Sequence, residues 1–207
     1  MPRPRAFNED QILQLVSDAF WSKGYEATST RDLVRVTGLT QPSLYNAFGD
    51  KRALFRRALE HYLDRSLRER IQRMEQQQPA EQAITAFFAE TIQRSLADPL
   101  HRGCLLVNSA LEASSDDPDL RQAINAELAQ MQAFFERTIE RIRDGIPALH
   151  RLTAHQAATT LLAVVLGIRV LARVNPSREL LLDSIQPVLS LLGLPALTLP
   201  SGETEHV

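Results

Sequence analysis

Apolar residues recur every three to four positions along almost the whole chain, and no stretch shows several short alternating segments joined by hairpin turns. This pattern predicts an all-α protein of about nine helices. In the first helix, Ile12, Val16 and Phe20 form one apolar stripe. Asn8, a residue type that caps helix starts, marks the beginning of this helix, and Gly24 marks its end.

Two short helices separated by a tight turn are expected next. Ser29 and Asp32 form a capping-box pattern that opens the first short helix, which ends near Gly38. Thr40 caps the second, in which a proline is tolerated within the first turn. This spacing fits a helix-turn-helix over residues 29–48. The apolar residues that would pack both short helices against the first helix are Leu33, Val36, Leu39 and Leu44.

The rest of the chain is also predicted to be helical. A long helix is expected from Lys51 to about Gln76. Five further helices are expected at roughly residues 80–97, 100–114, 118–144, 154–174 and 176–192. Pro187 lies inside the last of them and removes a backbone hydrogen bond, so a kink is expected there. Residues 193–207 contain Gly, Pro and Ser without periodicity and are expected to form a flexible tail.

The composition is that of a globular chain with a divided charge. Hydrophobic residues make up 44% and charged residues 23%, which excludes wholesale disorder. The formal net charge of −2 conceals an asymmetry, because residues 1–70 hold 12 Lys and Arg against 9 Asp and Glu, whereas the remainder holds 11 against 16. A modestly basic first third suits an anion-binding segment.

Several protein classes find no support in the chain. The longest apolar run, Leu161 to Ile168, is much shorter than the roughly 20 residues of a membrane span, and the N-terminus lacks a signal-peptide pattern. We therefore expect a cytoplasmic protein with no membrane partner. The single cysteine, Cys104, excludes an internal disulfide. The five histidines show no metal-binding spacing, and no phosphate-binding loop is present, so no metal, cofactor or enzymatic activity is expected. A helical enzyme that uses His101 and Glu112 stays open as an alternative.

The polar residues around the expected helix-turn-helix suit a nucleic acid. The second short helix carries a polar face whose side chains can bond base edges or phosphate oxygens: Gln41, Ser43, Tyr45 and Asn46. The basic residues nearby are Arg3, Arg5, Arg31, Arg35, Lys51 and Arg52. Such charges could neutralise phosphates. Short helices joined by a glycine turn also occur in helical proteins that bind no DNA, so the pattern alone leaves a structural role open.

Five motifs occur together within residues 6–66. They are Phe20 with Gly24-Tyr25, then Thr28-Ser29-Thr30-Arg31-Asp32-Leu33, Gly38-Leu39-Thr40, Leu44-Tyr45-Asn46-Ala47-Phe48 and Asp50-Lys51-Arg52-Ala53-Leu54. This combination resembles the DNA-binding head of the TetR family of transcriptional regulators. The resemblance implies phosphate contacts by Ser29 and Thr30, base contacts by Arg31, Gln41, Pro42 and Ser43, and backbone clamps at Tyr45 and Lys51. Val34 and Ala47 depart from the family's pattern, and we expect them to alter specificity rather than abolish binding.

The resemblance also implies a helical body over residues 67–192 that dimerises through its last two helices and holds an effector pocket. Residues 161–168 are apolar on all sides and need cover from several neighbours, which a dimer or a monomeric core would provide. The interface candidates are Leu161, Leu162, Val165, Leu181, Ile185, Val188 and Leu189. The ligand-binding candidates, which a plain core would equally explain, are Tyr62, Phe87, Phe88, Thr91, Cys104, Asn108, Met131 and Phe135.

Cys104 is open to two interpretations. It begins an expected helix beside Arg102, an environment that can make a thiol reactive and suit a sensor of oxidants or electrophiles. A cysteine among leucines and a valine also fits a small buried hydrophobic residue.

These expectations describe a homodimeric regulator that binds a near-palindromic operator of double-stranded DNA through two heads. We expect it to act as a repressor that an unidentified small-molecule effector releases. Thiol sensing at Cys104 is the alternative trigger.

Overall fold

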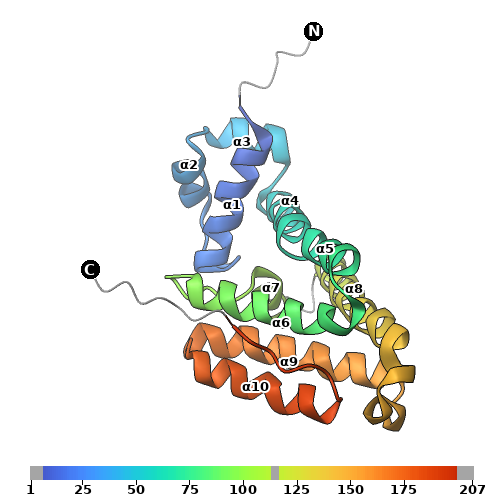
Figure 1. Ribbon diagram of the computed structural model, residues 1–207. Coiled ribbons are helices and arrows are strands. Elements are labelled where there is room, and N and C mark those ends of the chain that lie inside the picture. The colour runs from blue at the N-terminus through green and yellow to red at the C-terminus, as the bar shows by residue number, and fades with distance from the viewer. Residues whose placement is uncertain (1–6, 113–116, 200–207) are drawn as a thin grey trace. The chain divides into compact units, whose positions relative to one another are not determined.

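The computed structural model describes residues 7–112 and 117–199, and in this part of the chain every regular element is a helix (Figure 1). The α-helices are α1 (Glu9–Lys23), α2 (Thr30–Thr37), α3 (Gln41–Phe48), α4 (Lys51–Leu63), α5 (Glu69–Gln77), α6 (Ala80–Ala97), α7 (Leu105–Glu112), α8 (Pro118–Ile142), α9 (Ala154–Val174) and α10 (Arg178–Leu191). The other helical turns are the π-helical η1 (Asp64–Arg68) and the 3-10 turns η2 (Arg143–Gly145) and η3 (Pro147–Arg151). The all-α prediction is confirmed.

The chain packs as two units. Within the described residues, the first unit comprises 7–70, 102–112 and 117–127, and the second comprises 71–101 and 128–199. The sequence predicts a single domain boundary after residue 66, with each domain formed by one continuous segment. Packing instead joins α7 and the beginning of α8 to the first unit, because α7 contacts both α1 and α4.

The first unit is shaped by the capping residues that the sequence predicts. The side chain of Asn8 caps α1, and Gly24 ends it with a φ of 83°. Ser29 and Asp32 form a complete capping box at the start of α2, whose end at Gly38 has a left-handed φ of 68°. These caps set the lengths of the two short helices. The central apolar residues that are fully buried here are Val16, Phe20, Leu33, Leu44 and Leu54.

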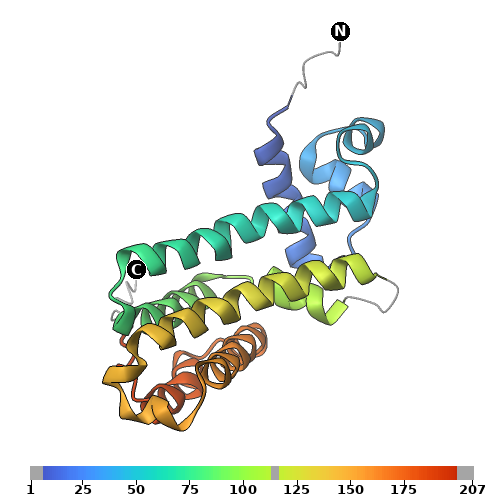
Figure 2. The same ribbon diagram turned by 90° about the vertical axis from the view of Figure 1, so that its right-hand side faces the viewer.

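α4 passes into α5 through the π-helical turn η1, so the helix expected from Lys51 to about Gln76 is continuous (Figure 2) but contains a π-helical turn. Arg68 in this turn lies 2.6 Å from Asp64 and 2.9 Å from Glu60, and it also pairs with Glu127 of α8. Glu127 is only 3% exposed, and its bond to Arg68 is the largest cause of the raised pKa of that guanidinium. The network therefore gives a buried carboxylate its partner.

Four phenylalanine rings from α6 and α8 form the centre of the second unit. The ring centroid of Phe135 lies 5.3 Å from that of Phe87, 5.8 Å from that of Phe88 and 5.1 Å from that of Phe134. All four side chains are buried. α9 and α10 lie side by side in this unit and both contact α6 (Figure 1).

The segment after α10 is packed rather than frayed. Leu194 and Leu197 are buried, and the side-chain amide of Gln186 donates to the Leu197 carbonyl at 2.6 Å. This corrects the expectation of a flexible tail for residues 193–199, because two apolar side chains three residues apart cover the second unit. Residues 200–207, like Arg3 and Arg5, lie outside the described residues. α10 continues through Pro187, and a kink there stays a prediction.

By length and composition, α9 is apolar enough to cross a membrane. The run of consecutive apolar residues from Leu161 to Ile168 is too short to indicate this. In the second unit its inward face is buried, and the Nη1 of Arg169 donates to the Ser95 hydroxyl at 2.9 Å. A core helix of a helical bundle satisfies the same test of composition.

Candidate nucleic-acid interface

The α2–turn–α3 element places the predicted polar face of α3 on the surface. Gln41, Pro42, Ser43 and Asn46 are exposed, whereas Leu44 between them is buried. Thr40 caps α3, since its side chain accepts a hydrogen bond from the Ser43 backbone. A short helix with one buried stripe and three exposed hydrogen-bonding side chains can present those side chains to base edges.

The residues that frame this face are already held by hydrogen bonds within the unit. The hydroxyls of Thr30 and Tyr45 lie 2.6 Å apart and link α2 to α3. The Ser29 hydroxyl donates to Asp32 at 2.6 Å, while Arg31 is exposed at the start of α2. The structure therefore brings the predicted phosphate-binding residues together at one edge of α2 and α3.

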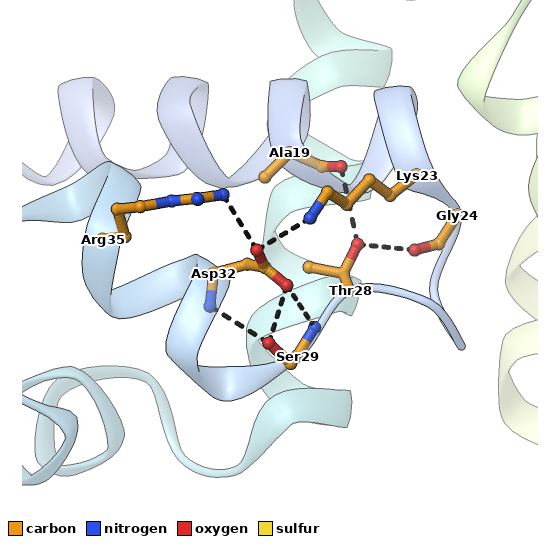
Figure 3. Close-up of polar contacts among 7 residues, drawn as sticks. All are labelled: Ala19, Lys23, Gly24, Thr28, Ser29, Asp32 and Arg35. Carbon is orange, nitrogen blue, oxygen red and sulfur yellow. Dashed lines mark hydrogen bonds and ion pairs between the residues drawn. The ribbon is translucent and has the colours of Figure 1, made fainter.

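Asp32 organises the start of α2 and the end of α1 (Figure 3). Its Oδ1 accepts from Lys23 Nζ at 2.7 Å and from Arg35 Nη2 at 2.9 Å, and its Oδ2 accepts from the Ser29 backbone at 3.0 Å. The bond from Lys23, followed by those from Ser29, holds the pKa of Asp32 far below its usual range. Arg35, a candidate phosphate ligand by sequence, is thus paired with a carboxylate that stays ionised.

Lys51, at the start of α4, is positioned by the loop after α1. Its Nζ lies 4.5 Å from the ring centroid of Tyr25 and donates to the Glu26 carbonyl at 3.4 Å. Burial, followed by the charges of Glu26 and Asp50, raises the pKa of Tyr25. The Gly24-Tyr25 pair was part of the resemblance, but nothing in its spacing indicated that the ring would lie beneath the Lys51 ammonium.

Two other basic residues of α4 are paired with carboxylates near the start of α8. Arg52 pairs with Asp117, and Arg56 lies 3.4 Å from Asp119. Burial acts to raise the pKa of Asp117, but the hydrogen bond from the Leu120 backbone and the pairing with Arg52 outweigh it and lower that pKa. The sequence did not indicate these pairs, because more than sixty residues separate the partners.

The ligand-binding candidates fall into two groups, one in each unit. Phe87, Phe88, Thr91, Met131 and Phe135 are buried in the second unit, where the phenylalanine rings pack on one another. The first unit holds the other three, and there the Tyr62 hydroxyl lies 3.7 Å from the Cys104 sulfur, while the Asn108 amide donates to the Arg102 carbonyl at 3.0 Å. The partner that burial requires for Asn108 is therefore a backbone carbonyl.

The structure places most of the interface candidates on the inward sides of their helices. Five of them are buried within this chain: Leu161, Val165, Leu181, Ile185 and Leu189. Leu162 and Val188 are half-buried. The sequence of a helix that is apolar on all sides does not indicate which side faces the core of its own chain. The predicted interface residues therefore include those on the inward side. The exposed apolar side chains of α9 and α10 are Val170, Val174 and Leu191.

One surface groove was not anticipated. It has a volume of about 430 Å³ in the first unit, between α1, α4 and the start of α8, and its lining includes Asp10, His61 and Leu120. The Nε2 of His61 is buried without a hydrogen-bond partner. No motif marks these residues, because they come from three separate segments.

An exposed helix-turn-helix on a helical body defines a DNA-binding protein of the transcription-factor class. Family models agree: residues 12–58 match "Bacterial regulatory proteins, tetR family", and residues 80–185 match "Tetracyclin repressor-like, C-terminal domain". The chain belongs to the TetR family of transcriptional regulators.

Individual relatives support the same assignment. The HTH-type transcriptional repressor ComR of Escherichia coli is 30% identical over 186 residues, which cover 87% of each chain. The HTH-type regulator YezE of Bacillus subtilis is 31% identical, over 70% of this chain and 74% of its own. The solved structure of a cysteine mutant of the TetR-family regulator CifR with 26-bp operator DNA has a TM-score of 0.80 and 34% identity, and covers 93% of this chain and 100% of that one.

Proposed function

We propose that the protein represses transcription as a homodimer on a near-palindromic operator, and that it acts by binding in the cytoplasm rather than by catalysis. The observation that carries the proposal is the exposed polar face of α3, Gln41, Ser43 and Asn46, in a chain of the TetR family. Two heads related by a two-fold axis would address half-sites about one helical turn, roughly 34 to 36 Å, or a multiple of it apart.

The outward faces of α9 and α10 support the proposed dimer. Val174 is 81% exposed, Leu191 is 79% exposed and Val170 is 42% exposed. Large apolar side chains exposed on two neighbouring helices suit a protein interface. The same surface of a second copy would bury them in an isologous contact.

We further propose that a small molecule bound in the body releases the operator. Such a ligand can weaken DNA binding only by its differential affinity for two states of the dimer, typically about 1 to 3 kcal/mol of coupling. The tetracyclin repressor-like body domain supports a ligand site in this part of the chain. The Tyr62, Cys104 and Asn108 group and the phenylalanine group remain the residues to test.

Selection of the purified protein on a randomised pool of DNA duplexes tests the proposal. We expect enrichment of a two-fold symmetric site, bound with an affinity that falls steeply as salt rises. Enrichment of an asymmetric single half-site would contradict the homodimer, and the absence of any enrichment would contradict operator binding.

A thiol trigger at Cys104 is the second candidate, because the Tyr62 hydroxyl lies 3.7 Å from its sulfur. Treatment with a thiol-blocking reagent should then release DNA from the native protein and leave the Cys104→Ser variant bound. Equal release from both proteins would exclude this trigger.

A further inference from the structure

Glu112, the last residue of α7, binds the loop that follows α1. Its Oε2 accepts a hydrogen bond from the Tyr25 backbone N–H at 2.7 Å. This N–H directly follows the C-cap Gly24, whose own N–H donates to the Phe20 carbonyl. A bond from an ionised acceptor is stronger than a bond between neutral groups.

Gly24 makes this approach possible. Its φ of 83° is a conformation that other residues rarely adopt. A Cβ at this position would lie 3.0 Å from the Glu112 Cδ and closer still to Oε1. The close approach of the carboxylate therefore depends on a glycine at the end of α1.

The far side of the same loop is also fixed. The Thr28 hydroxyl donates to the Gly24 carbonyl at 2.6 Å, and the Tyr25 ring packs 4.9 Å from Phe55. The Tyr25 ring and the Glu26 carbonyl are the two groups that hold the Lys51 ammonium. A displacement of the Tyr25 backbone would move both of them together.

We infer that Glu112 is a positioning residue for DNA binding: it fixes the loop at Tyr25 and thereby aims Lys51 at the phosphate backbone. The inference rests on the proposed phosphate contact of Lys51. Glu112 is exposed, so its replacement leaves the core of the unit intact. The residue touches neither the ammonium nor, in this proposal, the DNA.

Salt-dependent binding to a mixed-sequence duplex tests the inference without knowledge of the operator. Lys51→Ala should lower the slope of log affinity against log salt by about 0.9, the value of one phosphate contact. Glu112→Ala should weaken binding about threefold to tenfold and lower the slope by part of that amount. Glu112→Gln should bind within about twofold of the native protein, because its amide oxygen can accept the same hydrogen bond.

The double variant separates positioning from a general structural role. In the Lys51→Ala background, Glu112→Ala should have no further effect. Asp119→Ala, which breaks an exposed ion pair with Arg56 near the start of α8, is the matched control and should leave the slope unchanged.

A second pair of variants tests the ring. Tyr25→Phe keeps the aromatic face beneath Lys51 and should bind like the native protein, whereas Tyr25→Leu removes it and should resemble Glu112→Ala.

These measurements separate the positioning role of Glu112 from the phosphate contact of Lys51. If Lys51→Ala leaves the slope unchanged, the phosphate contact itself is wrong and the inference fails with it. If Lys51→Ala lowers the slope but the effects of Glu112→Ala and Lys51→Ala add, or Glu112→Gln binds as weakly as Glu112→Ala, the phosphate contact stands and the positioning role is overturned.

Discussion

The α2–α3 surface of the first unit and the outward faces of α9 and α10 in the second are both exposed, yet they are built in opposite ways. Around α2 and α3, polar side chains are fixed by short hydrogen bonds, such as the 2.6 Å contact between Thr30 and Tyr45. On α9 and α10, the exposed side chains include large apolar ones, Val174 and Leu191. A polar site is therefore specified by local geometry, whereas an apolar surface is specified by what covers it.

The largest expected effect concerns the interior of the second unit. Phe135→Ala should lower the free energy of unfolding by about 3 to 5 kcal/mol, because the ring is buried among three others. Urea-induced unfolding measures the loss, and Phe135→Leu, which keeps most of the volume, should lose less. A loss below about 1 kcal/mol would show that the ring lines a ligand cavity instead of supporting the core.

Val174→Glu should disrupt the proposed dimer. A charge buried at an apolar contact would have no partner of opposite charge there, so sedimentation should show a monomer. Operator affinity should fall about 100-fold, because two linked heads bind far more tightly than one. Ala129→Glu, at an exposed position on α8, is the matched control and should leave the dimer intact. A dimeric Val174→Glu protein would place the interface elsewhere.

Gln41→Ala should relax the preference at one base pair of the operator. Loss of its contact to a base edge would cost about 1 to 3 kcal/mol on the preferred sequence and little on others. Competition among single-base variants of the operator measures this. Tyr45→Phe is the contrasting variant, because loss of the hydroxyl proposed to bind phosphate should weaken all sequences alike. An unchanged preference in Gln41→Ala would refute the base contact.

The smallest expected effect is the acid sensitivity of Asp32. Because Lys23 lowers its folded-state pKa, the stabilisation is fully present above the unfolded value of about 3.9 and is lost as pH falls through the folded value. The difference in unfolding free energy between the native protein and Asp32→Asn should therefore be present at pH 7 and shrink below about pH 4. A constant difference from pH 7 to pH 2 would contradict the ion pair.

The sequence predicts the first unit well because its signals are local. Asn8, Ser29 and Thr40 cap the helices that they were expected to cap, and Gly38 adopts the positive φ expected at a turn. The contacts of Tyr25 and Glu112 were not predictable, since 87 residues separate the partners and no periodicity links them.

The second unit was harder to predict for a different reason. The sequence predicts its helices, but residues 161–168 of α9 are apolar on every side, so the direction of their buried face depends on α6 and α10. The sequence pattern therefore suggests an interface role for Leu161 and Ile185, whereas the structure buries both side chains in the core of the second unit.

The π-helical turn η1, between α4 and α5, determines how this continuous helix would respond to a change in its number of residues. A π-helical turn holds one residue more than an α-helical turn, so deleting one residue from residues 64–68 would let the turn relax to an α-helix while later side chains keep their directions. Ile71 and Met74 would stay buried, and Arg73 would stay exposed. A deletion within α4 itself has no such turn to absorb it and would rotate every later side chain by about 100°.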